Sequence, residues 1–161
     1  MDTVQIPCTL RNENSFLDVY ASDLLTLSIT KSFTVIVNAD PHTEGDSHWL
    51  AVNFCSKYSS AYHFDSYGIV PFVPDILAII KRNCTTWDRN KRQLQSLSRD
   101  VCGKYCCLFA LYMDRGYNPQ QFVALFSTVD VADRQVERMF TDEFGAEMSR
   151  GVWGQCCRSY L

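Results

Sequence analysis

The sequence lacks the features that mark secreted, membrane-spanning and nucleic-acid-coating proteins. No apolar run reaches the length of a membrane span, and the first seven residues show no basic stretch followed by an apolar one. The formal net charge is −3, whereas a protein that coats nucleic acid carries excess positive charge. We therefore expect a protein that is not secreted, works inside the cell and does not enter a membrane.

Two common arrangements of cysteine are also missing. The chain has 8 cysteines, but no two are spaced as C-x-x-C and none has a partner pair at zinc-finger spacing. We therefore expect no metal site. Without a secretion signal we do not expect a disulfide scaffold either. The cysteines should be mostly reduced thiols, with at least one kept for its reactivity.

The composition predicts one folded domain of the α+β class. Apolar residues make up 47% of the 161 residues, which is enough for one core. We expect a single domain over 1–161, with 1–14 irregular and 146–161 as a C-terminal tail. Helical spacing and caps predict helices over 15–26, 74–82, 102–115, 118–126 and 130–144, and β-rich runs predict strands over 33–38, 48–54, 60–66, 85–87 and 94–95. The expected architecture is a central, mostly antiparallel sheet packed by helices.

Cys102 stands where a polar loop enters a long apolar helix, so its thiol is expected at the N-terminus of a buried central helix. The helix dipole and the free N–H groups of the first turn favour a negative thiolate at such a position. The alternative is a structural cysteine in a core helix, which is the more common situation. The rest of the chain decides between these interpretations.

The two central strands place a histidine beside a carboxylate. In an antiparallel hairpin, opposite residues have a constant index sum, and a turn centred at Ser56-Lys57 makes that sum about 113. His48 then lies beside Asp65 at one end of the sheet. An aspartate that accepts from one imidazole nitrogen orients the ring, and the other nitrogen can hold a thiol proton. Cys102, His48 and Asp65 therefore form a candidate catalytic triad.

Other interpretations of these residues remain. His42 lies in a turn-rich loop, and His63 shares the strand face of Asp65 and could compete for it. A single histidine on a strand is usually structural, and an aspartate at a strand end is usually a turn cap. Gln95 could supply an amide donor for an oxyanion, together with the backbone N–H of Cys102. It could equally be an ordinary polar loop residue, as Gln93 nearby shows.

These residues together resemble a known clan of cysteine proteases. The matching pieces are His48-Trp49, then Phe64-Asp65-Ser66-Tyr67-Gly68, then Gln95 seven residues before Cys102-Gly103. In this order they are similar to the adenain/Ulp clan, and the resemblance spans about residues 33–126. It implies an adenain/Ulp-like cysteine protease fold with Cys102 as nucleophile, His48 as base, Asp65 as its orienting carboxylate and Gln95 as oxyanion donor. It also implies that Trp49 and Gly103 line a narrow substrate channel that favours glycine before the cleaved bond.

Within the clan, the viral branch is more similar. The run Cys102-Gly-Lys-Tyr-Cys106-Cys107 resembles the adenoviral enzymes, and Val37-Asn-Ala-Asp-Pro41 resembles versions from Polinton, adomavirus and adintovirus elements. The resemblance implies a monomeric thiol protease that cleaves viral capsid and core precursors during virion maturation, in the host nucleus and the virion. The alternatives are a SUMO or ubiquitin-like isopeptidase of the cytoplasm or nucleus, and an inactive binding module on the same fold.

Two accessory features follow from the viral resemblance, although the chemistry itself requires no cofactor. The spacing of Cys84 before Gln95 and Cys102 resembles the adenoviral cysteine that forms a disulfide with an activating peptide; the alternative is a core thiol at a helix end. Seven of the 15 basic residues fall within 81–104 and could bind DNA as an activator, the alternative being a solvated charged face. They are Lys81, Arg82, Arg89, Lys91, Arg92, Arg99 and Lys104. The tail with Cys156-Cys157 is expected to be a mobile end, docking in cis being the alternative.

Overall fold

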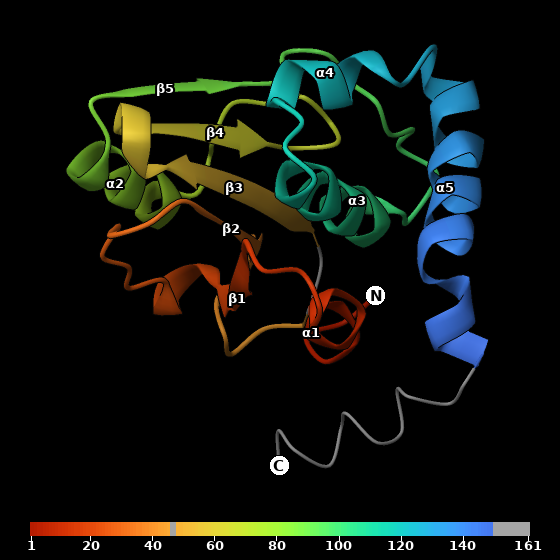
Figure 1. Cartoon of the computed structure of the whole chain (residues 1–161), viewed down its shortest axis with the longest axis horizontal. Coiled ribbons are helices and arrows are strands. Elements are labelled where there is room, and N and C mark those ends of the chain that lie inside the picture. Colours follow the sequence, from red (N-terminus) through yellow and green to blue (C-terminus); the bar gives the residue numbers. More distant parts are fainter. Residues whose placement is uncertain (46–47, 150–161) are drawn as a thin grey trace.

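The computed structural model describes residues 1–45 and 48–149, which form a mixed sheet between two layers of helices (Figure 1). The strands, in sheet order, are β1 (Phe16–Ala21), β2 (Phe33–Asn38), β3 (Trp49–Cys55), β4 (Ser60–Phe64) and β5 (Thr86–Arg89). The α-helices are α1 (Gln5–Leu10), α2 (Pro74–Asn83), α3 (Cys102–Asp114), α4 (Pro119–Ala124) and α5 (Val129–Ser149), and the 3₁₀ turns are η1 (Ser22–Leu24) and η2 (Ser56–Tyr58).

The two faces of the sheet bury separate apolar clusters. Alternate side chains of β3, among them Trp49 and Ala51, pack with α1, α3, α4 and α5, and the intervening ones, among them Leu50 and Val52, pack with α2. This alternation is the period of two expected of a strand buried on both faces. Helix α3 lies against the first face, with nine buried residues among its 13, so its position relative to the sheet is strongly constrained.

The α+β class and the central hairpin are confirmed. The pairings β2–β3 and β3–β4 are antiparallel, but β1–β2 and β4–β5 are parallel, so the expected antiparallel pattern holds only at the centre of the sheet. Four predicted helices form with small shifts at their ends, and Asn118 caps α4 through a capping box with Gln121.

Several predicted elements are wrong. Residues 16–21 form β1 rather than a helix, because their backbone pairs with β2, for example Val19 with Ile36. Residues 5–10 are helical, and 94–95 belong to an irregular segment. Helix α5 continues past Gly145 to Ser149, so only the part of the expected tail before residue 150 is described; the proposed docking of Cys156-Cys157 lies outside the described residues.

The thiols follow the expectation in part. Cys55, Cys84, Cys102, Cys106 and Cys107 are free, whereas Cys8 is disulfide-bonded.

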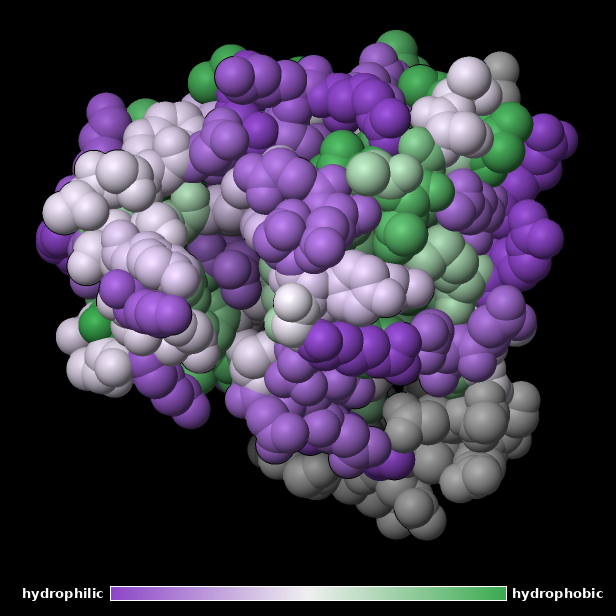
Figure 2. Space-filling view, turned by 45° about the horizontal axis from the view of Figure 1, so that its top comes forward, coloured by the Kyte–Doolittle hydropathy of each residue, from purple (hydrophilic) through white to green (hydrophobic). Residues whose placement is uncertain are grey.

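On the face that Figure 2 shows, hydrophilic side chains cover most of the surface and hydrophobic ones form small separate areas. None of the helices within 1–45 and 48–149 has the length and hydropathy needed to cross a bilayer.

Candidate active site

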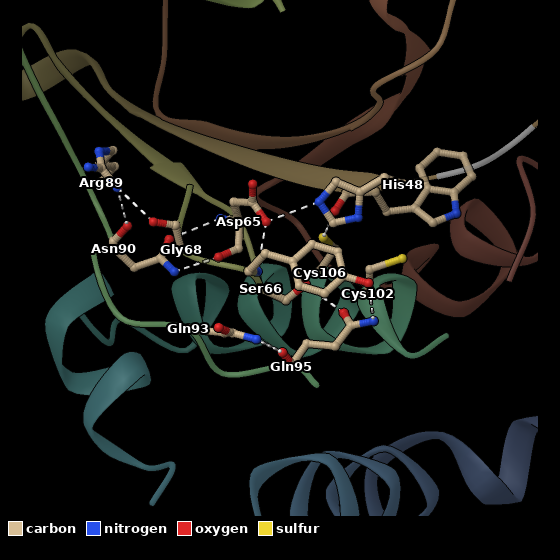
Figure 3. Close-up of polar contacts among 12 residues, drawn as sticks. His48, Asp65, Ser66, Gly68, Arg89, Asn90, Gln93, Gln95, Cys102 and Cys106 are labelled. Atoms are coloured by element: carbon tan, nitrogen blue, oxygen red, sulfur yellow. Dashed lines mark hydrogen bonds and ion pairs between the residues drawn. The ribbon is translucent and has the colours of Figure 1, made fainter. Parts of the chain in front are cut away.

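The central hairpin brings His48 and Asp65 together. His48 immediately precedes β3 and Asp65 immediately follows β4, and because these strands are antiparallel the two residues lie at one end of the sheet. His48 Nε2 is 3.0 Å from Asp65 Oδ1 (Figure 3). The His48 side chain is 13% exposed and that of Asp65 is 0% exposed, so the pair lies at the edge of the protein interior.

The register differs from the predicted one by two residues. Ala51 pairs with Phe64, where an index sum of 113 would pair it with Tyr62. A shift of two keeps every side chain on its expected face, which is why the predicted neighbours still meet. The ring of Tyr67 lies against that of His48, with centroids 4.8 Å apart and planes inclined by 31°.

His48 is set up to carry a proton. Burial lowers the pKa of His48, but hydrogen bonds to Asp65 and Cys102 and the negative charges of those two groups outweigh it and raise the pKa to about 9. An imidazolium can therefore persist at neutral pH beside Cys102. This is the arrangement that a thiolate–imidazolium pair requires.

A polar network holds Asp65 in place. Asn90, 3% exposed, accepts from the Asp65 backbone N–H at 2.9 Å and donates to the Asp65 carbonyl at 2.5 Å. The backbone N–H of Tyr67 donates to Asp65 Oδ1 at 2.8 Å, and that of Gly68 donates to the Asp65 carbonyl at 2.8 Å. Asn90 was not among the predicted site residues, because nothing in the sequence pattern distinguishes it from other polar residues in this irregular segment.

Cys102 is the first residue of α3 and is only 2% exposed. Its Sγ lies 3.8 Å from Asp100 Oδ1, a long contact that is weak even for sulfur. One turn further along the helix, the Cys106 thiol donates to the Trp49 carbonyl at 3.3 Å, which ties α3 to the start of β3. The helix thereby fixes Cys102 relative to the strand that follows His48.

The neighbouring thiols on α3 are kept protonated. Complete burial raises the pKa of Cys106 well above its usual value, and the negative charge of Cys102 adds to this. Complete burial also raises the pKa of Cys107. Both are core thiols, whereas Cys102 is the cysteine whose charge helps to raise the pKa of His48.

Gln95 is fully buried and its amide is fixed at both ends. Oε1 accepts from the Ser66 hydroxyl at 2.7 Å, and Nε2 donates to the Tyr67 hydroxyl at 3.2 Å and to the Arg99 carbonyl. Figure 3 shows the amide with its nitrogen toward Cys102 and its oxygen toward Ser66. Ser66 and Tyr67 belong to the Phe64–Gly68 motif, but no spacing in the sequence linked them to Gln95.

Trp49 and Gly103, the two residues predicted to line a substrate channel, lie next to each other and are both buried. A Cβ added to Gly103 would lie 3.4 Å from Trp49 Cδ1 and 3.0 Å from Met1 Cβ. The indole N–H of Trp49 donates to the Met1 carbonyl at 3.0 Å. Trp49 is buried, so the glycine leaves room at a crowded position beside Cys102.

The other two histidines do not take the place of His48. His42 pairs with Asp23 at 2.6 Å on the surface. His63 is 1% exposed, and neither of its ring nitrogens has a partner among the described residues. Burial lowers the pKa of His63 to about 4, so it is neutral. It therefore does not bind Asp65 directly, although the two share a strand face.

The accessory residues are dispersed. Cys84 caps α2 and is half-buried against the α2-side cluster, and this burial raises the pKa of its thiol. Of the basic residues, Arg89 and Arg92 donate to backbone carbonyls, and Arg99 and Lys104 lie within 3.7 and 3.8 Å of Glu137. Lys81, Arg82 and Lys91 are exposed. The seven residues therefore do not form one free cationic face.

A pocket of about 550 Å³ lies at the opposite end of β3 and β4, and none of the candidate triad lines it. Its lining includes Tyr62, Trp87, Asp88 and Tyr117. Residues 1–45 and 48–149 contain no group of three or more His, Cys, Asp or Glu side chains that could hold a metal ion. The candidate site at the other end of these strands contains a thiol, an imidazole, a carboxylate and an amide.

Comparison with known proteins agrees with this chemistry. No family model matches the chain. The chain is 29% identical over 87 residues to a protease of human adenovirus B serotype 3, covering 46% of this chain and 42% of that protein. It is 27% identical over 116 residues to a protease of bovine adenovirus 4, covering 62% and 58%. The chain is adenain-like. It spans about half the length of these curated relatives.

The fold agrees with the sequence similarity. The structure of the ASFV pS273R protease matches this adenain-like chain with a TM-score of 0.54 at 19% identity, over 71% of this chain and 44% of that one. At this identity the likeness concerns the fold alone. The adenain-like chain therefore shares its fold with one viral protease and part of its sequence with others.

Proposed function

We propose that the chain is a cysteine endopeptidase that cleaves viral capsid and core precursor proteins at glycine-containing sites. The observation that carries this proposal is the 3.0 Å contact between His48 and the buried Asp65, together with Cys102, the first residue of α3, which is among the groups that raise the pKa of His48. Asp65 orients the ring, the ring keeps the thiol proton, and the dipole of α3 favours the thiolate.

The reaction proceeds in two stages. The Cys102 thiolate adds to the peptide carbonyl, and the Cys102 backbone N–H stabilises the oxyanion together with Gln95, which acts either directly or through a neighbouring donor. Collapse expels the amine, which takes the proton from His48 and leaves a thioester. His48 then takes a proton from water, which attacks the thioester and frees Cys102. Trp49 and Gly103 would shape the channel for the residue before the cleaved bond.

The deciding experiment compares wild type with Cys102→Ala on candidate capsid precursors. Cys55→Ala is the matched control, because Cys55 is a free thiol at the far end of β3. Wild type and Cys55→Ala should process the precursors, and Cys102→Ala should not. Equal processing by Cys102→Ala would refute the proposal.

A SUMO or ubiquitin-like isopeptidase is the alternative use of the same site. A SUMO- or ubiquitin-derived electrophile and a glycine-containing peptide electrophile separate the two activities. Labelling of Cys102 by the peptide probe alone supports the endopeptidase, and labelling by the SUMO or ubiquitin probe alone favours the isopeptidase. Failure of both probes, with and without the activators described next, would favour an inactive binding module.

An activating peptide and DNA remain proposals for the viral setting, in the host nucleus and virion, with the enzyme as a monomer. A cysteine-containing peptide would pair with Cys84, so Cys84→Ser should keep the basal rate and lose the activation. DNA activation should rely on the exposed Lys81, Arg82 and Lys91 and should fall steeply with salt. Activity unchanged by DNA at low salt would remove this cofactor.

A further inference from the structure

The amide of Gln95 has no free hydrogen to give. A side-chain amide carries two N–H hydrogens, and in Gln95 one is donated to the Arg99 carbonyl and the other to the Tyr67 hydroxyl at 3.2 Å. The residue is 0% exposed, so a substrate atom has no open route to it. Donation from Gln95 to a third acceptor would require one of these hydrogen bonds to break.

The hydroxyl of Tyr67 has the opposite property. Its oxygen accepts from Gln95, and no described residue accepts its hydrogen. Tyr67 is half-buried whereas Gln95 is fully buried, so Tyr67 is the more accessible of the two residues. Partial burial, with the negative charges of Cys102 and Asp100, raises the pKa of Tyr67, so it keeps this hydrogen at neutral pH.

Tyr67 also lies at the reacting groups. Its ring lies against His48, its backbone N–H donates to Asp65, and its hydroxyl contacts Gln95, whose nitrogen side faces Cys102 in Figure 3. Three of the four candidate catalytic side chains therefore contact this one residue. Its position is held by the same turn that holds Asp65, because Gly68 N–H donates to the Asp65 carbonyl.

We propose that the Tyr67 hydroxyl is the side-chain donor to the oxyanion and that Gln95 acts through it. This inference rests on the proposed function. When the Cys102 sulfur adds to the carbonyl carbon, the π electrons move to oxygen, which receives hydrogen bonds from the Cys102 backbone N–H and from Tyr67. No proton moves to this oxygen. Its electrons re-form the carbonyl as the C–N bond breaks, and the amine takes the proton of His48.

The role of Gln95 in this arrangement is to polarise the phenol. A hydroxyl that accepts a hydrogen bond donates a stronger one, because successive hydrogen bonds in a chain reinforce each other. Ser66 begins the chain by donating to Gln95 Oε1 at 2.7 Å. The chain of hydrogen bonds thus runs from Ser66 in the core through Gln95 and Tyr67 to the oxyanion, and each donor in it points toward the reacting atom.

Tyr67→Phe tests the proposal, because it keeps the ring beside His48 and the backbone N–H to Asp65 while removing one oxygen. Loss of one oxyanion donor should lower kcat by roughly 10²–10³-fold with little change in KM. A glycine-ended peptide aldehyde, whose adduct with Cys102 places an oxygen in the same position, should bind more weakly by a similar factor. Alkylation of Cys102 by iodoacetamide forms no oxyanion and should keep the wild-type rate, and Tyr117→Phe is the matched exposed control.

The outcomes separate the possibilities. Unchanged kcat in Tyr67→Phe overturns the proposal, and so does an equal loss of alkylation rate, which would mean a disturbed site. In the Tyr67→Phe background, Gln95→Ala should lower kcat by a much smaller factor than it does in wild type. If it lowers kcat by the full wild-type factor, Gln95 contacts the oxyanion directly. If wild type is alkylated but cleaves no peptide, the proposed function fails, and aldehyde affinity still tests the donor.

Discussion

Ser66 Oγ donates to Gln95 Oε1 at 2.7 Å, and both residues are 0% exposed. An amide has two ends of different chemistry, and this hydrogen bond determines which end faces the catalytic groups. Ser66 follows Asp65 directly, and its carbonyl also accepts from the backbone N–H groups of Leu94 and Gln95, at 2.8 and 3.0 Å. The strand end that carries the carboxylate therefore also orients the amide.

Ser66→Ala should lower activity without unfolding the protein. The buried Gln95 Oε1 would lose its partner, which costs roughly 1–3 kcal/mol and makes the flipped amide competitive. We expect kcat to fall by roughly tenfold or more with KM almost unchanged. Ser98→Ala is the control, since Ser98 is exposed and its hydroxyl lies 3.3 Å from that of Ser96, outside the candidate site. Peptide cleavage kinetics alongside urea unfolding would show whether Ser66→Ala instead loses activity only in proportion to folded protein.

Asp65→Asn should both slow the reaction and shift its pH dependence. The Asp65 hydrogen bond and charge help to raise the pKa of His48 to about 9 against the lowering effect of burial. His48 therefore keeps its proton up to that pH in wild type. In Asp65→Asn the pKa should fall, so the imidazolium and the alkaline limb of activity disappear at a lower pH. The rate should fall by roughly 10²–10⁴-fold.

The pH profile of kcat/KM checks this prediction, with Asp23→Asn as the control. Asp23 also pairs with a histidine, His42, through Nδ1 at 2.6 Å, but this contact lies on the surface and outside the candidate site. The pH profile of Asp23→Asn should match that of wild type. An alkaline limb that stays in place in Asp65→Asn would mean that His48 does not limit activity on that side.

The sequence predicted the parts of the site that depend on local structure. His48 and Asp65 could be paired because the hairpin between them is short and its register follows from the turn. The turn at residues 56–59, with Ser59 at φ 47°, is longer than expected, yet the two-residue shift preserved the faces. Cys102 could be placed because a polar loop preceding an apolar run marks a helix start.

The rest depends on contacts between distant residues. Phe16, Leu17 and Tyr20 have helical spacing, but the segment forms β1 because β2 offers it a parallel partner. Helix α1 has only six residues, too few for a periodic pattern, and it packs against α3 and β1. The Asp2 carboxylate accepts from the backbone N–H groups of Val4 and Gln5 at its start. Tyr67 and Asn90 join the site through an irregular path of the chain, which no periodicity describes.

Gly68 should be essential for the site, whereas Gly116 should matter only for stability. Both have positive φ, 68° and 85°, so alanine strains either backbone. A Cβ at Gly68 would also lie 2.6 Å from the backbone carbonyl of Arg92, whereas Gly116 faces open space. Gly68→Ala should therefore displace the segment that carries Gln95, lower kcat and destabilise more than the roughly 1–2 kcal/mol expected of Gly116→Ala.

Urea unfolding and cleavage kinetics on the two variants separate strain from displacement. Gly116→Ala should lose stability and keep the activity of its folded fraction. Gly68→Ala should lose both, and the loss of activity should persist at temperatures where it is fully folded. If both variants show the same stability and activity, the close approach to Arg92 has no functional consequence.

His63 should make the fold sensitive to acid. Burial lowers its pKa to about 4, the charge of Asp65 opposes this, and those of Arg89 and His48 reinforce it. The folded state therefore holds His63 neutral, while the unfolded chain protonates it near pH 6.5. The stability that depends on a neutral His63 is fully present above pH 6.5. It is lost as the pH falls from 6.5 toward 4, which lowers the free energy of unfolding by up to roughly 3 kcal/mol.

His63→Leu should remove this sensitivity, because neither ring nitrogen has a partner to lose among the described residues. The free energy of unfolding of the variant should exceed that of wild type at pH 4.5, and the difference should shrink by pH 8. The carboxylates contribute equally to the pH dependence of both proteins, so their effect cancels in the difference. Urea unfolding at a series of pH values therefore measures the contribution of His63 alone. A variant less stable than wild type by the same amount at every pH would show that His63 contributes through hydrogen bonds or packing instead.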